Sequence, residues 1–470
     1  MADPGATLLA RVAATVGSSD VLTAAADIAP YVSDWRGRFH GSALAVVRPD
    51  SVEDVAAIVK LCAVANVPLV AQGGNTGLCG AATPLDDGAS IVLSLTRLNR
   101  VRGVDVDNAT LTIEAGATLA QGQAAAAERG LLFPLSLASE GSCTIGGNLS
   151  TNAGGTSVLR FGNARDLVLG LEVVLADGRV WNGLRALRKD NTGYDLKHLF
   201  IGAEGTLGII TAAVLKLYPA PRTSATAFVG VRDVAMAVHL LALMKASLAD
   251  RLVAFELISD LALMLSRKHH QGQDPLPGHR WYVLLQVDDP AENATLRSEL
   301  EASLANAIET EVALDATIAE SQSQSAALWA LRENISEAQR REGPNIKHDI
   351  AMPVSAIPSF LSDAETALRA ELPGVRFVIF GHLGDGNLHY NLSAPEGVDA
   401  QSFMHNAAIA NRIVHDLVSQ ASGSISAEHG IGQLKREELR RYKSPLELEL
   451  MARIKTALDP HNLMNPGKVL

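Results

Sequence analysis

Apolar and polar positions alternate between residues 41 and 95 in a way that predicts a small strand–helix–strand unit. Residues 52–64 repeat apolar side chains at helical spacing, and Ser51 stands directly before them. Glu53 and Asp54 follow in what would be the first turn. A serine cap and early acidic residues are typical of a helix start, so we expect a helix over 52–64. The strands predicted around it are 43–47, 67–71 and 91–95.

From residue 101 to residue 218 the pattern changes to short apolar runs separated by many glycines. Residues 1–40, ahead of both patterns, predict a helical lead-in. Pro219-Ala220-Pro221 ends this part of the chain, because two prolines break regular structure and stiffen a linker. We therefore expect a first domain over residues 1–220. Its later strands are predicted at 111–113, 168–175 and 207–217.

A second composition, rich in Ala and Leu at helical spacing, begins after residue 221. Mixed helices and strands in this order are typical of an α+β domain with antiparallel pairing. We expect this domain over 221–425, followed by a C-terminal helical segment over 426–470 that completes the active site and packs on the first domain. The predicted helices are 233–249, 291–308, 316–342, 434–442 and 446–458, and the predicted strands include 281–287 and 377–380.

The segment 376–392 carries the most specific chemistry in the chain. Its pattern predicts a hairpin made of a strand over 376–380, a turn over 384–387 and a return strand over 388–392. With that four-residue loop, His382 would face His389, and directly opposed residues have Cβ atoms roughly 4.5–5.5 Å apart. Two imidazoles at this spacing are able to share one metal ion. The alternative is two hydrogen-bonded histidines that flank an ordinary hairpin.

Glu428 and His429, within Ser426-Ala427-Glu428-His429-Gly430, add a carboxylate and a third imidazole. Two histidines and one carboxylate with an open coordination position are typical of a catalytic metal site rather than a structural one. We therefore expect His382, His389 and Glu428 to bind zinc. Manganese and iron stay open, because the same ligands suit them as well.

Composition narrows the class of protein. The 470 residues are 47% apolar, which allows two or three domains with sizeable cores. A net charge of −11 argues against a nucleic-acid partner. We expect no membrane span, since no apolar run approaches the roughly 18–20 residues that it needs, and no secretory signal. Three scattered cysteines form neither a disulfide framework nor an iron–sulfur site, so we expect a reducing, cytoplasmic setting.

Three glycine-rich clusters, at residues 70–80, 141–155 and 202–208, predict a site for a phosphorylated ligand. Glycine allows backbone N–H groups to converge into a concave nest for phosphate oxygens. None of the clusters matches GxGxxG at a strand–helix junction or GxxxxGK[ST], which disfavours a nicotinamide site and a P-loop. Each cluster alone fits an ordinary turn, but the three together indicate one large phosphorylated ligand.

These motifs resemble the FAD-binding oxidases and dehydrogenases of the vanillyl-alcohol-oxidase type, from about residue 40 to the C-terminus. Residues 73–80, 139–152 and 191–211 are similar to that family's three flavin-contacting stretches. Residues 187–194, 381–389 and 426–430 are most similar to its D-2-hydroxyglutarate dehydrogenase branch, with D-lactate and glycolate dehydrogenases as near relatives. The resemblance implies an α+β fold, with a two-subdomain FAD-binding domain and an α+β substrate (cap) domain that has an antiparallel sheet.

The resemblance also implies that FAD is bound tightly but not covalently. Members with covalent FAD carry a histidine in the first glycine loop, and Asn75 stands at the comparable place here. The residues matched to the FAD site are Gly73, Gly74, Asn75, Thr76, Gly77, Ser139, Gly141, Gly146, Gly147, Asn148, Asn152, Gly205 and Ile210.

A mechanism follows from these residues. A flavin accepts hydride, and the protein supplies orientation and proton handling. A metal held by the three expected ligands would chelate the α-hydroxyl and one carboxylate oxygen of a 2-hydroxy acid, which lowers the pKa of the hydroxyl. His429 would then take the hydroxyl proton, because imidazole titrates near neutral pH. The resemblance implies the same roles and places Asn391 against the substrate.

A further constellation concerns the choice of substrate. Trp329, Arg332 and Ser336 share one face of a predicted helix, at i, i+3 and i+7. The resemblance matches Arg332, Ser336 and Lys347 to the group that binds a substrate carboxylate, although Lys347 read alone fits a surface lysine. A bidentate arginine supported by a lysine suits a carboxylate remote from the metal. This favours a dicarboxylic D-2-hydroxy acid.

We therefore expect FAD-dependent, metal-assisted oxidation of D-2-hydroxyglutarate to 2-oxoglutarate. D-lactate, glycolate and D-malate are alternative substrates within the family. A zinc hydrolase built on the same three ligands and a non-catalytic flavin carrier are alternatives from other classes. With no nicotinamide motif, we expect an electron-transfer flavoprotein, a quinone or a cytochrome as the electron acceptor, and a homodimer is compatible with the sequence.

Overall fold

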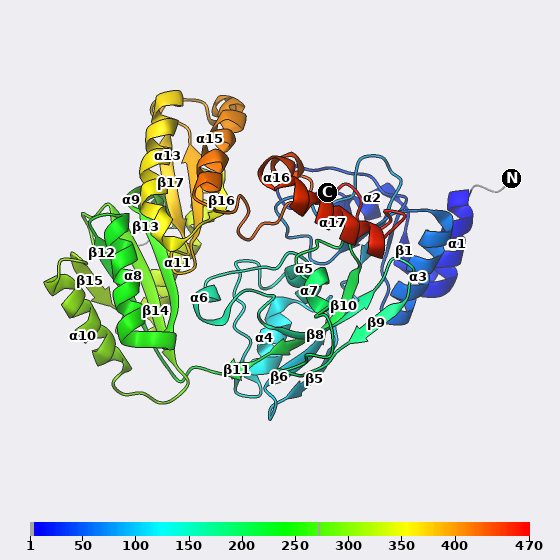
Figure 1. Cartoon of the computed structure of the whole chain (residues 1–470), viewed down its shortest axis with the longest axis horizontal. Coiled ribbons are helices and arrows are strands. Elements are labelled where there is room, and N and C mark those ends of the chain that lie inside the picture. The colour runs from blue at the N-terminus through cyan, green and yellow to red at the C-terminus, as the bar shows by residue number, and fades with distance from the viewer. Residues whose placement is uncertain (1–3, 271–272) are drawn as a thin grey trace. The chain divides into compact units, whose positions relative to one another are not determined.

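A computed structural model describes residues 4–270 and 273–470, and the chain forms two compact units (Figure 1). Residues 1–3 of the expected N-terminal lead-in lie outside the described residues. Unit 1 consists of the chain up to Gly154, together with Asn163–Ala220 and Glu428–Leu470. Unit 2 consists of Gly155–Gly162 and Pro221–Ala427. The two units are described separately below.

Unit 1 begins with a four-stranded sheet in the order β1-β2-β4-β3. The strands β2, β4 and β3 are parallel, which agrees with the strand–helix–strand pattern of the sequence. The Ser51 side chain accepts a hydrogen bond of 3.2 Å from the N–H of Asp54, so the predicted helix cap is confirmed. The strands are β1 (Val21–Leu22), β2 (Ala45–Val47), β3 (Leu69–Gln72) and β4 (Ile91–Ser94).

An antiparallel five-stranded sheet, in the order β5-β6-β10-β8-β9, forms the second half of unit 1. The predicted strands around 111–113, 168–175 and 207–217 are confirmed as β6, β8 and β10. The strands are β5 (Val101–Asp105), β6 (Thr110–Glu114), β8 (Val168–Val174), β9 (Val180–Gly183) and β10 (Ile209–Lys216), with the separate pair β7 (Leu131–Leu132) and β11 (Tyr218–Pro219).

The helices of unit 1 cover these sheets and include the C-terminal helices. Leu8 and Val12 of α1 and Ile58 of α3 are buried in one cluster with Leu69 of β3. The helices are α1 (Pro4–Val16), α2 (Ala25–Ile28), α3 (Val52–Ala65), α4 (Leu119–Ala127), α5 (Ile145–Ser150), α7 (Lys197–Phe200), α16 (Arg436–Tyr442) and α17 (Pro445–Leu458). The last two match the helices predicted near the C-terminus.

Unit 2 is built on a seven-stranded sheet in the order β15-β12-β14-β13-β17-β18-β16. All of its pairings are antiparallel, as the sequence predicted. The strands are β12 (Thr223–Val231), β13 (Leu252–Ser259), β14 (Trp281–Asp289), β15 (Asp315–Ile318), β16 (Asp349–Ala351), β17 (Arg376–Gly381) and β18 (Asn387–Ser393).

Helices α9, α11 and α12 pack on one face of this sheet, where they share a buried cluster with Phe228, Tyr282 and Phe380. Helix α8 contacts β12, β13 and β14, and α10 packs against α8. The helices of unit 2 are α6 (Val158–Phe161), α8 (Val234–Leu248), α9 (Asp260–His270), α10 (Leu296–Glu309), α11 (Gln322–Glu333), α12 (Ile335–Arg341), α13 (Ile357–Glu371), α14 (Ala400–Phe403) and α15 (Ala407–Gln420).

The single helix predicted over 316–342 is wrong. Residues 315–318 instead form the edge strand β15, which pairs with β12. The helix starts only after Ser321, whose side chain accepts a hydrogen bond of 3.2 Å from the N–H of Gln324. Asn334 then separates α11 from α12. Short polar side chains that bond to nearby backbone groups favour such boundaries, and the helical spacing of the apolar residues concealed them.

Among the described residues, no helix combines the length and the apolar character that crossing a bilayer requires.

Candidate functional site

One face of the unit-2 sheet brings His389 together with two buried carboxylates, those of Asp349 and Glu256. Ile258 pairs with Phe380, Phe380 pairs with His389, and His389 pairs with Asp349 across neighbouring strands. Paired residues project to the same face of a sheet, and residues two apart on one strand do the same. Glu256 therefore shares this face. It is the face on which α9, α11 and α12 pack.

The two histidines of the hairpin are diagonal neighbours and do not face each other as predicted. His389 lies opposite Phe380, and the N–H of Asn387 donates to the carbonyl of His382 at 3.2 Å. Gly381 ends β17 at a φ of +144°, and a Cβ there would lie 2.8 Å from the Asn387 oxygen. His382 thus belongs to the loop. The turn lies at residues 383–386 and not at 384–387 as predicted. Moving the turn back by one residue changes the pairing by two, so the predicted register is wrong by two residues.

Glu256, on β13, is a buried carboxylate with a different partner on each oxygen. Oε1 lies 2.7 Å from Nδ1 of His382, and Oε2 accepts from Nε of Arg332 at 2.7 Å. Only 1% of its surface is exposed. Burial raises the pKa of a carboxyl group, but the charges of His382 and Arg332 outweigh it and lower the pKa of Glu256 to about 2. The group is therefore ionised.

His382 and His389 are arranged as two ligands of one metal would be. Their ring centroids are 5.5 Å apart, and the ring planes are inclined by 77°. Two imidazoles bound tetrahedrally at about 2.0–2.1 Å would have centroids roughly 5 Å apart. Because Nδ1 of His382 faces an ionised carboxylate, it carries the proton, and Nε2 is the nitrogen suited to a metal. Both histidines belong to a group of possible metal ligands.

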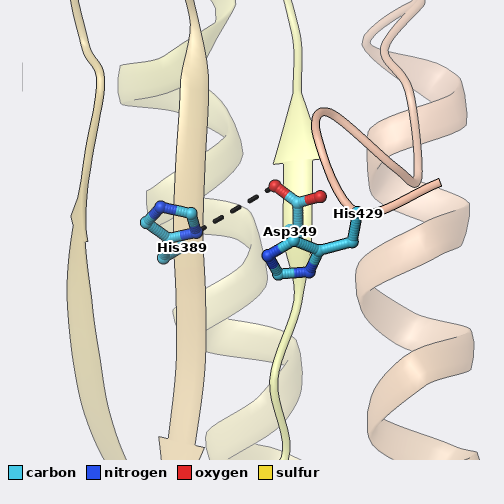
Figure 2. Close-up of side chains that lie close together, drawn as sticks. All are labelled: Asp349, His389 and His429. Atoms are coloured by element: carbon cyan, nitrogen blue, oxygen red, sulfur yellow. Dashed lines mark ion pairs between the residues drawn. The ribbon is translucent and has the colours of Figure 1, made fainter. Parts of the chain in front are cut away.

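A second buried carboxylate, Asp349 on β16, accompanies His389 on β18 (Figure 2). Its Oδ1 lies 4.0 Å from Nδ1 of His389, which is an ion-pair distance but too long for a hydrogen bond. Nδ2 of Asn387 donates to the same oxygen at 3.1 Å. Each of the two histidines therefore has an acidic side chain on its Nδ1 side.

Arg332, on α11, is buried at this face with its charge only partly paired. Its guanidinium carbon lies 4.8 Å from the centre of the Phe380 ring, a cation–π distance. Nε binds Glu256, whereas Nη1 and Nη2 make no hydrogen bond to the part of the chain that the structure describes. Two parallel N–H donors of this kind match the two oxygens of a carboxylate.

The other residues assigned to the substrate lie on neighbouring elements of unit 2. Ser336 is exposed on α12, one helix after Arg332, and Lys347 is half-buried ahead of β16. Asn391, on β18, is buried and already has partners: its Nδ2 donates to Oε1 of Gln339 at 2.7 Å, and its Oδ1 accepts from the N–H of His348 at 3.3 Å. An amide has two N–H donors and two lone pairs on its oxygen, so these two bonds do not use its full capacity to bind a substrate.

In unit 1, the first and second glycine clusters are packed against each other. A Cβ on Gly74 would lie 1.8 Å from the carbonyl oxygen of Ser142, and a Cβ on Gly73 would lie 2.1 Å from Oγ1 of Thr144. Only glycine permits this approach. The segments at 73–80 and 141–148, far apart in sequence, therefore form one surface.

The third cluster is joined to the second by backbone bonds. The N–H of Gly202 donates to Leu149 at 3.0 Å, and the N–H of Glu204 donates to Ser150 at 2.8 Å. Gly77 and Gly141, in contrast, are exposed and have nothing within 4 Å of a Cβ. Unit 1 thus brings the three clusters together and leaves space beside two of their glycines.

The polar side chains of the clusters hold the loops in shape. Asn75 and Asn152 both have a φ of +52°, a left-handed backbone conformation that asparagine tolerates. Nδ2 of Asn75 donates to Ser33 at 2.8 Å, and Oδ1 of Asn152 accepts from the N–H of Arg165 at 2.9 Å. The other residues assigned to FAD are half-buried or buried: Thr76, Ser139, Gly146, Gly147, Asn148, Gly205 and Ile210.

Glu428 and His429 begin the C-terminal part of unit 1. Within this unit, an oxygen of Glu428 lies 2.7 Å from where a Cβ of Gly154 would be. Within unit 2, the preceding residue Ala427 donates its N–H to the carbonyl of Asp349 at 3.3 Å. The chain therefore leaves unit 2 beside Asp349, and Glu428 is the next residue along.

Glu204, in the third glycine cluster, anchors the segment that follows His429. Its two oxygens accept the N–H groups of Ile431 at 2.6 Å and Gly432 at 2.7 Å. Burial raises the pKa of Glu204 and outweighs these two bonds, which lower it, so the net shift of the pKa is upward. This carboxylate links a glycine cluster to the segment that carries the proposed metal and proton chemistry.

Three site residues were missed from the sequence: Glu256, Asp349 and Glu204. Glu256 carries a detectable signal, because it is the only charged residue in the apolar run 252–258, which forms a strand buried on both faces. A charge is costly there unless it is paired. Glu204 has a weaker signal, since one acid in a glycine-rich turn is common.

Comparison with known families agrees with the two parts of the fold. Residues 43–183 match the FAD binding domain, and residues 220–469 match the C-terminal domain of FAD linked oxidases.

Curated relatives match over nearly the full length. The chain is 39% identical to a D-2-hydroxyglutarate dehydrogenase from Xanthomonas citri, covering 95% of this chain and 93% of the relative. It is 39% identical to the mitochondrial D-2-hydroxyglutarate dehydrogenase of Bos taurus, covering 96% and 81%. A D-2-hydroxyglutarate dehydrogenase from Stutzerimonas stutzeri is 37% identical, with 100% and 99% covered.

Solved structures share the fold at low sequence identity. p-Cresol methylhydroxylase with bound substrate superposes with a TM-score of 0.79 at 18% identity, covering 99% of this chain and 96% of that one. 4-Ethylphenol oxidase from Gulosibacter chungangensis gives 0.72 at 19% identity, covering 100% and 97%. These likenesses confirm the expected fold class.

Proposed function

Because this chain belongs to the FAD-linked oxidase family, alongside the D-2-hydroxyglutarate dehydrogenases, we propose that it oxidises D-2-hydroxyglutarate to 2-oxoglutarate with FAD. The observation that carries the choice of substrate is the position of Arg332. Its guanidinium offers two N–H groups on the same sheet face as the histidine pair His382 and His389. A dicarboxylic substrate would use both ends of such a site.

FAD would be held by the three glycine clusters of unit 1, and when bound it accepts the hydride that leaves Cα of the substrate. The left-handed Asn75 stands in the first cluster, so no covalent attachment through a histidine at that position is available. Gly77 and Gly141 leave room for phosphate oxygens beside the backbone. The remaining assigned residues would orient the rest of the cofactor.

A divalent metal, zinc in our proposal, would be held by His382, His389 and Glu428 and would act as a Lewis acid on the substrate's hydroxyl oxygen. His382 is prepared for this role, because Glu256 fixes the proton on Nδ1. The N–H of Ala427 donates to the carbonyl of Asp349, and Asp349 pairs with His389 across neighbouring strands. Glu428 is the next residue after Ala427, which supports its assignment as the third ligand.

His429 would remove the proton from the substrate hydroxyl as the hydride leaves Cα, which leaves the carbonyl of the 2-oxo acid. An imidazole suits this role, because its ordinary pKa lies near neutral pH. Arg332 would bind the carboxylate at the other end of the substrate, with Ser336, Lys347 and Asn391 as its supporting contacts.

Reduced flavin has to pass its electrons on. In line with the absence of a nicotinamide fingerprint in the sequence, we propose an electron-transfer flavoprotein, a quinone or a cytochrome as the acceptor. The three cysteines are buried and form no disulfide among the described residues, and we propose a reducing cytoplasmic compartment. A homodimer is a further proposal that size measurements will decide.

A substrate panel tests the function directly. Purified protein is assayed with an artificial electron acceptor on D- and L-2-hydroxyglutarate, D-lactate, D-malate and glycolate, with and without added zinc. We expect bound flavin, a preference for D-2-hydroxyglutarate measured as kcat/KM, and dependence on the metal. A higher kcat/KM on D-lactate or glycolate would contradict the proposed substrate, and a colourless folded protein would contradict the flavin chemistry.

A further inference from the structure

Glu256 belongs to a closed ring of five side chains that joins the two ends of the proposed substrate site. Its partners are His382 and Arg332, both at 2.7 Å. Arg332 lies over Phe380 at 4.8 Å, and the ring of Phe380 lies 4.9 Å from that of His389. The centroids of the two histidines are 5.5 Å apart, which completes the ring.

We propose that Glu256 is a positioning residue that sets His382 and Arg332 together, one with each carboxylate oxygen. The inference rests on the proposed function, since it assigns His382 to the metal and Arg332 to the distal carboxylate. No substrate contact is assigned to Glu256 itself. Glu256 would thereby couple the metal-binding end to the carboxylate-binding end, so that a change at Arg332 alters metal affinity through His382.

The chemistry of the carboxylate explains why both partners need it. Oε1 fixes the proton of His382 on Nδ1, so that Nε2 is presented as a ligand, and such partners of metal-binding histidines raise metal affinity. Oε2 accepts from Nε of Arg332, which leaves Nη1 and Nη2 as the donors for the distal carboxylate of the substrate. An ionised oxygen on each side accepts from a donor, and among the common side chains only a carboxylate, of Glu or of the shorter Asp, accepts twice in this way with a negative charge.

Glutamine at this position cannot satisfy both partners. If its oxygen accepts from Nδ1 of His382, its NH₂ group faces the N–H of Arg332, and two donors repel. If the amide is reversed, its NH₂ group donates to Nδ1 of His382, which moves the proton to Nε2 and removes the ligand. Aspartate keeps the charge and two oxygens but is shorter by one methylene. The Gln variant should therefore fail more severely than the Asp variant.

The first experiment compares Glu256→Gln and Glu256→Asp with the wild type. Zinc affinity is measured by competition with a chromophoric chelator, and kcat and KM are measured on D-2-hydroxyglutarate. We expect Glu256→Gln to lose about 10–100-fold in zinc affinity, the range found for such partners of metal-bound histidines, and Glu256→Asp to recover part of it. KM should rise in the Gln variant even at saturating zinc, because Arg332 is no longer held.

Asp288→Asn is the matched control, because Asp288 is a buried carboxylate on the neighbouring strand β14 whose side chain pairs with Gln286. It should leave zinc affinity and KM within about twofold of the wild type. An equal loss in Asp288→Asn and Glu256→Gln would overturn the inference, since general loosening of the sheet would then explain both.

A second experiment tests the coupling without altering Glu256, in case its variants do not fold. Arg332→Met removes one partner of the carboxylate and touches no proposed metal ligand, and we expect it to change zinc affinity at least threefold. Arg251→Met, which removes an arginine of the same unit whose ion pair is with Glu299, should not. Unchanged zinc affinity in Arg332→Met would overturn the coupling.

The outcomes separate this inference from the function on which it rests. If the wild type oxidises D-2-hydroxyglutarate with zinc and Glu256→Gln has unchanged zinc affinity and KM, the inference alone is wrong. If the wild type binds zinc with the expected dependence on Glu256 but prefers another substrate, the positioning role of Glu256 on His382 stands and the proposed substrate is wrong.

Discussion

Phe380, and not His382, lies opposite His389 across the hairpin of β17 and β18. The ring centroids of Phe380 and His389 are 4.9 Å apart, and the guanidinium of Arg332 covers the same phenyl ring. Phe380 therefore contacts both a member of the histidine pair and the arginine. The proposed metal-binding end and carboxylate-binding end are built on one short stretch of sheet.

The flavin assignment predicts that a substitution at Gly77, which has free space beside it, lowers flavin binding and leaves the fold intact. Gly77→Ala meets no protein atom within 4 Å, so the fold should persist, but flavin occupancy should fall because the methyl group fills space meant for the cofactor. Gly103→Ala, equally open but on β5 outside the clusters, is the control. Absorbance of released FAD after denaturation measures the effect. Full flavin content in Gly77→Ala would argue against phosphate binding at this loop.

Gly74→Ala should instead damage the fold. Its Cβ would overlap the backbone of Ser142, which cannot give way as a flexible side chain would. We expect loss of about 2 kcal/mol or more of stability, in line with overpacking of a tight contact. Thermal unfolding of Gly74→Ala and Gly77→Ala, compared side by side, separates this effect from loss of flavin.

Metal removal should abolish turnover while the flavin stays bound. None of the residues assigned to FAD is a proposed metal ligand, so chelation should not release FAD. Activity should return when zinc is added back. Metal content measured by elemental analysis gives the stoichiometry, and full activity at zero metal content would reduce His382 and His389 to a structural role.

Arg332→Ala should affect substrates according to whether they carry a second carboxylate. Loss of a charge-assisted bidentate contact should cost D-2-hydroxyglutarate about 100-fold in kcat/KM, equivalent to roughly 3 kcal/mol. D-lactate, which has no such group, should lose much less. Steady-state kinetics on both substrates provide the measurement, and an equal loss would exclude Arg332 as the distal carboxylate site.

His429→Gln should lower kcat without loss of flavin or metal. Removal of a general base costs typically 10²–10⁴-fold. The pH profile of kcat/KM should lose its acidic limb in the variant, because that limb reports protonation of the base. If the variant keeps that limb, another group accepts the proton.

A buried ion network in unit 1 predicts a pH dependence of stability. Burial raises the pKa of Glu114, but bonds from Arg100 and Arg102 outweigh it, and the net shift is downward. A carboxyl group with a lowered pKa stabilises the fold above its unfolded pKa of about 4.3, and this contribution is lost as the pH falls through the folded value.

Arg102→Met should therefore cost about 2 kcal/mol at neutral pH, since it leaves Glu114 and Glu172 buried with fewer partners, and it should flatten the acid side of the stability profile. Arg179→Met, which breaks an ion pair whose side chains are 76% and 52% exposed, should cost less than about 0.5 kcal/mol. Denaturant titrations across acidic pH measure both. Equal costs would contradict the assigned role of the network.

Much of this protein was readable from local sequence. The cap at Ser51, the parallel strands around it and the antiparallel pairing of unit 2 follow from side-chain spacing and turn chemistry, which act over a few residues. The glycine clusters and the histidine motif were equally visible, because their members stand close together in the sequence.

Only the tertiary structure decided how those motifs meet. The register that sets His389 against Phe380 depends on where the chain turns, and a shift of two residues keeps every side chain on the same face, so the apolar pattern could not detect it. The partners of Glu256, which lies on β13, come from α11 and the hairpin loop, more than 70 residues away in sequence. A charged residue in a buried strand predicts that it has partners, but packing between distant segments decides which groups these are.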